Sequence, residues 1–259
     1  MASQIPTYPE GRNLLKGKSV VITAAAGSGI GFATAKRCAE EGARVLLSDL
    51  HERRLNEAVE TLSGEGHDAS GMVCDVTDEE QVQSLVDYGK EQFGTIDVMV
   101  NNAGLGGQSN LVEMTDEQWF KVIDVTLNSA MRCTRAALRH MIPNGKGVIV
   151  NNASVVGWRA QEGQSHYAAA KAGVMALTRC SALEAASSGI RINAVSPSFA
   201  SHPFLEKVSD PKLLRALESQ EPFGRGAEPW EVANVIVFLA SDLSGYMTGE
   251  SVSVSSQHP

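Results

Sequence analysis

Short runs of β-branched and aliphatic residues alternate, from Ser19 to the end of the chain, with longer stretches in which apolar residues recur at helical spacing. This alternation is typical of strand–helix–strand units, which build a parallel sheet with helices on both faces. We therefore expect an α/β fold with one doubly wound parallel sheet of about seven strands. The predicted strands cover residues 19–23, 44–48, 69–73, 96–100, 147–150, 191–195 and 251–254, and the predicted helices cover 30–41, 52–62, 78–93, 115–141, 166–186 and 228–240.

The longest predicted helix, over residues 115–141, carries signals at both ends. Thr115 followed three residues later by Gln118 has the pattern of a capping box, which begins a helix. Pro143 and Gly145 follow the other end, and both residue types disfavour continuation of a helix. The sequence therefore predicts one long helix between these signals.

Two segments depart from the periodic pattern. Residues 1–14 precede the first strand and are expected to form an N-terminal extension of a single catalytic domain that takes up residues 1–259. Residues 198–223 are rich in proline, serine and charged side chains, and a long irregular stretch inside a compact domain is usually functional. We expect this second segment to form a loop or lid on the substrate side.

Composition and charge are typical of a globular protein that binds a small molecule. Hydrophobic residues make up 43% of the chain and charged residues 20%, which allows a large buried core. Lysine and arginine total 22 against 30 aspartates and glutamates, a net charge of −8, so neither a nucleic acid nor a membrane is an expected partner. No apolar run approaches the roughly 20 residues that span a bilayer, and the polar start does not resemble a signal peptide, so we expect a cytoplasmic protein. Four widely spaced cysteines predict reduced thiols and no metal site.

A glycine-rich loop follows the first predicted strand directly and opens the first helix. Gly27, Ser28, Gly29, Ile30 and Gly31 form this loop. Glycines at a strand-to-helix turn let the backbone approach a pyrophosphate, whose charge then meets the free N–H groups of the helix. The alternative is a glycine turn without a ligand. The flanking strand and helix, together with a later acidic residue, favour a dinucleotide site.

That acidic residue is Asp49, which ends the second predicted strand about 20 residues downstream, as a dinucleotide-binding fold requires. Its carboxylate would accept hydrogen bonds from ribose hydroxyls and repel a 2′-phosphate, which favours NAD over NADP. Arg53 and Arg54 follow closely and would favour NADP if they reached a phosphate instead of solvent. After the third strand, Asp75, next to Val76, either bonds the adenine edge or caps the turn that follows.

Tyr167 and Lys171 stand four residues apart on a predicted helix and so share one face, while Ser154 follows the fifth strand. A tyrosine phenol is a poor base at neutral pH, and a nearby ammonium would lower its pKa by stabilising the phenolate. Ser154 would hold a substrate oxygen near Tyr167 while a nicotinamide exchanges a hydride at the adjacent carbon. The alternative is a Tyr-x-x-x-Lys pair on a helix surface. The sequence therefore predicts interconversion of an alcohol and a ketone.

These motifs, in this order, resemble the short-chain dehydrogenase/reductase family over residues 15–254. Besides the glycine loop and the Ser154, Tyr167 and Lys171 set, the chain has Asn-Asn-Ala-Gly at 101–104, which is similar to the family's motif after the fourth strand. The resemblance implies a Rossmann-type single domain and a homotetramer or homodimer. It further implies cofactor contacts from Asn102, Ala103, Gly104, Tyr167, Lys171, Pro197 and Ser198.

Within the family, residues 151–160, residues 165–171 and the ending at 256–259 most resemble bacterial dehydrogenases that act on a ring hydroxyl of a CoA-linked steroid remnant. The 3-oxoacyl-carrier-protein reductases are a more distant resemblance. The expected protein is thus an NAD-dependent oxidoreductase of steroid degradation. The alternatives are a 3-oxoacyl reductase and, from another class, an NAD-binding sensor or assembly protein without turnover.

The chain departs from the family pattern at four places. The family's Thr-Gly at the head of the glycine loop is matched to Ala24–Ala25, and an asparagine that completes a proton relay is matched to Thr126. The usual Pro-Gly after the sixth strand is Pro197–Ser198. A threonine that often binds the nicotinamide amide corresponds to His202, which is then either a substrate-side contact or an ordinary loop histidine. Thr126 is expected to support the relay only in part, because it lacks the second polar group of an amide.

Overall fold

Seven parallel strands form one sheet in the computed structural model, which describes residues 3–202 and 211–257. The order across the sheet is β3-β2-β1-β4-β5-β6-β7, so the direction of progress reverses between β1 and β4. In such sheets ligands bind outside the carboxyl ends of the strands at this reversal. The strands are β1 (Ser19–Ile22), β2 (Arg44–Asp49), β3 (Ala69–Val73), β4 (Val98–Asn101), β5 (Gly147–Asn152), β6 (Ile190–Pro197) and β7 (Ser251–Val254).

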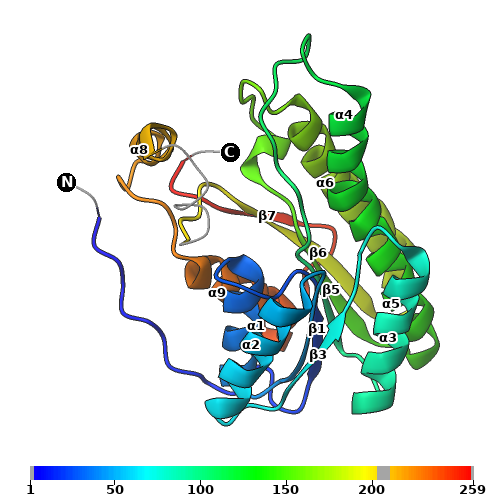
Figure 1. Ribbon diagram of the computed structural model, residues 1–259. Helices are drawn as coiled ribbons and strands as arrows, with labels where there is room; N and C mark the ends of the chain where they lie inside the picture. Colours follow the sequence, from blue (N-terminus) through cyan, green and yellow to red (C-terminus); the bar gives the residue numbers. More distant parts are fainter. Residues whose placement is uncertain (1–2, 203–210, 258–259) are drawn as a thin grey trace.

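Helices cover both faces of the sheet (Figure 1). Successive strand residues point to opposite faces, so Val20 and Ile22 join one buried cluster and Val21 joins the other. One face carries α1 (Ile30–Glu40), α2 (Glu52–Gly64) and α9 (Pro229–Ala240), and the other carries α3 (Glu79–Phe93), α5 (Ser129–Asn144) and α6 (Ser165–Ala186). The predicted doubly wound α/β fold is confirmed.

The helix predicted as one element over residues 115–141 contains a π-helical turn. The capping box of Thr115 and Gln118 is present and begins α4 (Asp116–Ile123). A π-helical turn, η1 (Asp124–Asn128), then joins α4 to α5. The prediction of one long helix is confirmed, since helical residues run without a break from Asp116 to Asn144. The π-turn was not predicted, because such a turn adds a residue without changing the apolar pattern enough to be recognised. Pro143 lies inside α5, which ends at Asn144, and Gly145 follows with a φ of +64°.

The segment at 198–223 was expected to be irregular, but it contains α8 (Pro211–Gln220). Residues 203–210 of the predicted lid lie outside the described residues. The N-terminal segment runs in extended form across α1 and α9, where the Tyr8 hydroxyl donates to Glu40 at 2.8 Å and the ring meets Trp230 edge-on. The extension is therefore attached to the body of the protein at its aromatic side chain.

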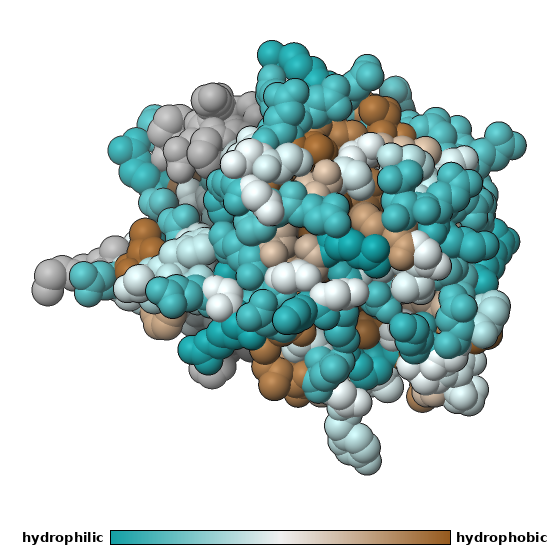
Figure 2. Space-filling model, turned by 90° about the horizontal axis from the view of Figure 1, so that it is seen from below, coloured by the Kyte–Doolittle hydropathy of each residue, from teal (hydrophilic) through white to brown (hydrophobic). Residues whose placement is uncertain are grey.

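Hydrophilic side chains cover most of the face seen from below, and hydrophobic ones gather there in separate small patches (Figure 2). Among the helices of the described residues, none combines the length and the apolar character needed to cross a membrane. The thiols of Cys38, Cys74, Cys133 and Cys180 are all free, and only Cys180 is exposed. Two short 3-10 turns, η2 (Val155–Gly157) and η3 (Asp242–Ser244), complete the elements.

Candidate active site

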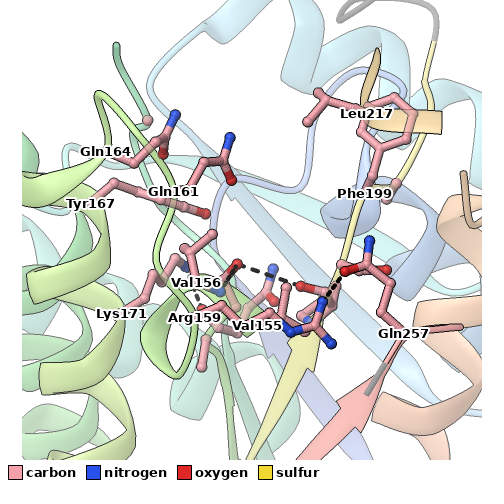
Figure 3. Close-up of a pocket in the computed structure, with 18 of the residues that line it drawn as sticks. Val155, Val156, Arg159, Gln161, Gln164, Tyr167, Lys171, Phe199, Leu217 and Gln257 are labelled. Carbon is pink, nitrogen blue, oxygen red and sulfur yellow. Dashed lines mark hydrogen bonds between the residues drawn. The ribbon is translucent and has the colours of Figure 1, made fainter. Parts of the chain in front are cut away.

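A cavity of about 560 Å³ opens at the carboxyl ends of the central strands (Figure 3). Its wall comes from the loops after β4, β5 and β6, from the start of α6, and from α8 and the C-terminal segment. Of the residues singled out in the sequence, it brings together Ile30, Asn102, Gly104, Ser154, Tyr167, Lys171, Pro197, Ser198 and His202. The others do not form part of its wall: Gly27, Ser28, Gly29, Gly31, Asp49, Asp75, Val76, Ala103 and Thr126.

Tyr167 and Lys171 lie one turn apart on α6, as their spacing predicts. The ammonium nitrogen of Lys171 is 5.5 Å from the centre of the Tyr167 ring and donates to the carbonyl oxygen of Asn152 at 2.5 Å. Lys171 is only 2% exposed, so this carbonyl holds it in place from the end of β5. The Ser154 hydroxyl caps η2 by accepting from the amide of Val156 at 3.4 Å. The three side chains therefore share one wall of the cavity.

The pKa values of this pair are set by burial. Burial raises the pKa of the Tyr167 phenol to about 12, and a hydrogen bond with Ser154 opposes the rise. Burial also lowers the pKa of Lys171 to about 7. The predicted lowering of the Tyr167 pKa by the Lys171 ammonium is therefore not seen in this structure, where burial is the largest effect on both groups. A protonated Tyr167 is suited to give a proton to a carbonyl oxygen.

The head of the glycine loop contains one residue with a positive φ. Ala24 has a φ of +50°, a conformation that favours glycine, whereas Ala25 does not have a positive φ. Thr23 precedes it, and its hydroxyl oxygen accepts from the amides of Asn102 and Ala103 at 3.0 and 3.1 Å. The positive φ thus falls on Ala24, the first of the two residues matched to the family's Thr-Gly pair. Spacing alone does not show which of the two residues bends the chain.

The glycine loop packs tightly against the protein at Gly31 and faces open space at Gly27 and Gly29. A Cβ atom at Gly31 would lie 2.2 Å from the carbonyl oxygen of Ala24, so only glycine permits this packing. At Gly27 and Gly29 a Cβ would meet no heavy atom within 4 Å. Gly29 is also the N-cap of α1, and it has no side chain to cap the helix. Free N–H groups beside open space fit a pyrophosphate of a dinucleotide.

Asp49 ends β2 with its side chain 8% exposed, beside the glycine loop. Its carboxylate accepts from the amide of Ala26 at 3.3 Å and from that of His51 at 3.0 Å. Arg54 lies 3.7 Å away, whereas Arg53 is largely exposed and faces Glu57. The structure therefore brings one of the two arginines to the carboxylate that is expected to select the cofactor.

Asp75 adopts the turn-capping arrangement. Its Oδ1 accepts from both the amide and the hydroxyl of Thr77, at 2.9 and 2.7 Å. Val76 and Ala103 are 9% exposed and pack in the buried cluster under α3 and α5. His202 lines the cavity, at the edge of the described residues. A substrate contact by His202 stays a prediction.

The cavity also contains residues that motif reasoning did not single out. Phe199 and Leu217 contribute apolar walls, and Arg159, Glu221 and Gln257 contribute polar ones. Arg159 and Gln257 lie within sequence stretches that carry the family resemblance, but nothing local shows that the two meet. Among the described residues, no group of three or more histidine, cysteine or acidic side chains is arranged to hold a metal ion.

A doubly wound sheet, a glycine loop at its first crossover and a Ser–Tyr–Lys set at the same edge define an oxidoreductase that uses a nicotinamide cofactor. A sequence model described as enoyl-(acyl carrier protein) reductase matches residues 24–256. The chain belongs to the short-chain dehydrogenase/reductase family. The family assignment made from the motifs is confirmed.

Relatives of this chain act on ring compounds and acyl thioesters, as their names state. The chain is 60% identical, over 99% of both proteins, to the (5R,7aS)-5-hydroxy-7a-methyl-1-oxo-2,3,5,6,7,7a-hexahydro-1H-indene-carboxyl-CoA reductase of Mycobacterium tuberculosis. It is 42% identical to a 3-oxoacyl-[acyl-carrier-protein] reductase of Thermotoga maritima, over 93% of this chain and 97% of that protein. The crystal structure of a short chain dehydrogenase from Mycobacterium smegmatis superposes with a TM-score of 0.89 at 56% identity, covering 99% of each chain.

Proposed function

We propose that this protein interconverts a ring ketone and a secondary alcohol on a CoA-linked intermediate of steroid-ring degradation, with NAD as its cofactor. The observation that carries the proposal is the identity of 60% along the whole chain to a reductase named for a bicyclic, oxygenated CoA ester. The cavity supports it, because its apolar walls and a Ser–Tyr–Lys set suit a ring with one reacting oxygen.

In this proposal Ser154, Tyr167 and Lys171 are the catalytic residues. A bound nicotinamide supplies or accepts the hydride at the reacting carbon. The Ser154 hydroxyl holds the substrate oxygen, and Tyr167 transfers its phenolic proton to that oxygen during reduction. A pKa of about 12 keeps this proton on Tyr167 at neutral pH, which is the form that can donate to a carbonyl oxygen. In the reverse direction Tyr167 receives the proton of the alcohol.

Lys171 would then restore the proton that Tyr167 gives away. Its pKa of about 7 allows it to exchange a proton with its surroundings near neutral pH. The carbonyl oxygen of Asn152 holds the amine, and Gly104 lies beside both this amine and Thr126 of the π-turn. We propose that a water bound by the backbone of this turn connects Lys171 with solvent, which is how Thr126 would take part in a relay.

We propose the glycine loop and its neighbours as the cofactor site, with Asp49 selecting NAD. The buried carboxylate would accept from the ribose hydroxyls and repel a 2′-phosphate, although Arg54 at 3.7 Å reduces that repulsion. Pro197 and Ser198 would lie beside the nicotinamide, and His202 would contact the substrate. The complete proposed set is Gly27, Ser28, Gly29, Ile30, Gly31, Asp49, Asp75, Val76, Asn102, Ala103, Gly104, Tyr167, Lys171, Pro197 and Ser198.

We further propose that residues 1–259 act as one catalytic domain in the cytoplasm, as a homotetramer or homodimer. Light scattering of the purified protein in solution measures the number of subunits. A monomer at working concentration would exclude the oligomer.

A second candidate is reduction of 3-oxoacyl thioesters, favoured by the 42% identity to an acyl-carrier-protein reductase. The test is to supply the purified protein with NADH or NADPH and either the 5-oxo form of the bicyclic CoA ester or acetoacetyl-CoA, and to follow the absorbance of the reduced nicotinamide. Faster turnover of the bicyclic ester supports the first proposal. Faster turnover of acetoacetyl-CoA supports the second, and turnover of neither favours a cofactor-binding protein without catalysis.

A further inference from the structure

A polar cluster closes the side of the cavity that lies across from Tyr167. Figure 3 shows Tyr167 entering from α6 on one side, and Arg159 and Gln257 meeting on the other. Arg159 follows η2, whereas Gln257 belongs to the C-terminal segment after β7. The cavity thus has a catalytic end and, opposite it, an end with a guanidinium group.

This guanidinium is held in place by a chain of hydrogen bonds. Arg159 Nη1 donates to Gln257 Oε1, and Gln257 Nε2 donates to Glu221 Oε1 at 2.9 Å. Glu221 is only 4% exposed, and its other oxygen accepts from the Ser256 hydroxyl at 2.7 Å. The amide of Phe199 also donates to Glu221, at 3.4 Å. Glu221 therefore anchors the amide of Gln257, which in turn orients Arg159.

Arg159 is also fixed relative to the catalytic serine. The amide nitrogen of Arg159 donates to the carbonyl oxygen of Val155 at 3.0 Å, which continues the turn that begins directly after Ser154. The reacting end and the guanidinium end of the cavity are therefore joined by one short, hydrogen-bonded stretch of backbone. Such a connection keeps the distance between the two ends constant, which a site that selects substrates by length requires.

The character of the wall between these ends indicates what fits there. Val155, Val156, Phe199 and Leu217 give it apolar surface suited to the body of a ring system. An arginine is always charged and donates through a planar fork, so it recognises oxygen acceptors such as carbonyl and carboxylate groups. The arrangement suits a substrate with an oxygen at each end of an apolar ring body.

We propose that Arg159 is a specificity-determining residue, oriented by Gln257 and Glu221, which binds an acceptor oxygen on the substrate remote from the reacting carbon. The acceptor is a ring carbonyl or a carboxylate. This inference rests on the proposed function, since it assigns the second contact of the same substrate in the same cavity.

Two pairs of ring ketones test the proposal in the holoenzyme. The first pair is a methylhydrindane dione and the mono-ketone that lacks its remote carbonyl, and the second is 4-oxocyclohexanecarboxylate and 4-methylcyclohexanone. For each pair, the ratio of kcat/KM with and without the remote oxygen is compared between wild type and Arg159→Met. Loss of a charge-assisted hydrogen bond should lower the ratio about tenfold to a hundredfold. A drop in the first ratio identifies a carbonyl acceptor, and a drop in the second identifies a carboxylate.

Two further variants separate binding from orientation. Gln257→Ala should raise KM for the preferred ketone more than it lowers kcat, because Arg159 stays present but loses its orientation. Arg159→Lys should give an intermediate ratio, because the charge remains while the planar fork is lost. Arg12→Met, on the exposed N-terminal segment, is the matched control and should leave both ratios as in wild type. Equal ratios in wild type and Arg159→Met for both pairs would overturn the proposal.

Binding measured by calorimetry keeps this inference separate from the proposed function. If neither pair is reduced with NADH or NADPH, the ring-ketone function fails, and calorimetric titration of the dione into the cofactor-loaded protein then decides the role of Arg159. Weaker binding of the dione by Arg159→Met than by wild type would support the subsite. Equal binding, or none by either protein, would refute it.

Discussion

The Thr126 hydroxyl makes two hydrogen bonds to the backbone of one residue, Leu105. It donates to the Leu105 carbonyl at 3.1 Å and accepts from the Leu105 amide at 3.0 Å. Thr126 is 1% exposed and sits in the π-turn, while Leu105 directly follows Gly104, which lines the cavity. Thr126, which is expected to serve a proton relay, therefore also holds the loop after β4 against the π-turn.

Thr126→Val removes both of these bonds while keeping the shape of the side chain. The variant should lose about 1–3 kcal/mol of stability, because a partly buried amide and carbonyl are left without this partner. Displacement of the loop and of the proposed relay water should also lower kcat several-fold and change its pH profile. Thr126→Ser, which keeps the hydroxyl, is the control. Unchanged stability and kinetics in Thr126→Val would show that neither role is real.

Tyr167→Phe should lower kcat by about a hundredfold or more, because general acid–base catalysis contributes this much and only the transferable proton is removed. Binding of the cofactor, measured by fluorescence titration, should remain close to wild type. Tyr246→Phe changes the same group on a fully exposed side chain and serves as the control. A kcat for Tyr167→Phe within about threefold of wild type would disprove the assignment.

Lys171→Met should make the protein more stable near neutral pH. Burial lowers the pKa of Lys171 from 10.5 to about 7, so between these values the unfolded chain holds a proton that the folded chain lacks. The stability of wild type therefore rises with pH across this window, and the full cost of burying the charge remains below it. The stability gap between variant and wild type should shrink by about 1.4 kcal/mol per pH unit above pH 7.

Urea denaturation of both proteins at several pH values measures this gap. The carbonyl of Asn152 loses its donor in the variant, but that loss is the same at every pH. The change of the stability gap with pH is therefore the quantity that tests the pKa of Lys171. A gap that does not change between about pH 7 and about pH 10 would mean that Lys171 keeps an ordinary pKa.

Asp49→Asn should reduce the preference for NAD over NADP by about tenfold or more, because it removes the charge that repels a 2′-phosphate. The amides of Ala26 and His51 donate to different oxygens of the carboxylate, and an asparagine keeps only one acceptor oxygen, so one of these two bonds should be lost in the variant. Values of kcat/KM for the two cofactors measure the preference. In a protein that keeps Asp49, Arg54→Ala should increase the preference for NAD over NADP. A wild-type preference for NADP would show that Arg54, and not Asp49, decides the cofactor.

Ala24→Gly should stabilise the protein by about 1 kcal/mol, because an L-residue at positive φ costs about this much and glycine does not. For a chain of this size the melting temperature should rise by about 2–4 °C. Ala25→Gly is the matched control, since Ala25 is fully buried and has no positive φ. It should destabilise the protein. A lower melting temperature in Ala24→Gly would contradict the conformational argument.

Local patterns predicted most of the strands and helices correctly, because runs of β-branched residues and helical spacing are properties of neighbouring residues. They missed α8, a short helix that begins at Pro211 inside a stretch rich in turn-forming residues. They also missed the π-turn, because its hydrogen bonds reach one residue further than those of an α-helix and leave the apolar pattern nearly intact.

The sequence by itself determined the doubly wound fold, the family, and the pairing of Tyr167 with Lys171, since each depends on spacing along one element or on motifs in a fixed order. The tertiary structure decided what surrounds them. It gave Ala24 a positive φ, brought Arg159 against Gln257, and buried Lys171 so that its pKa fell. Contacts between distant segments and the loss of water around a side chain arise only when the chain is folded, so no local pattern encodes them.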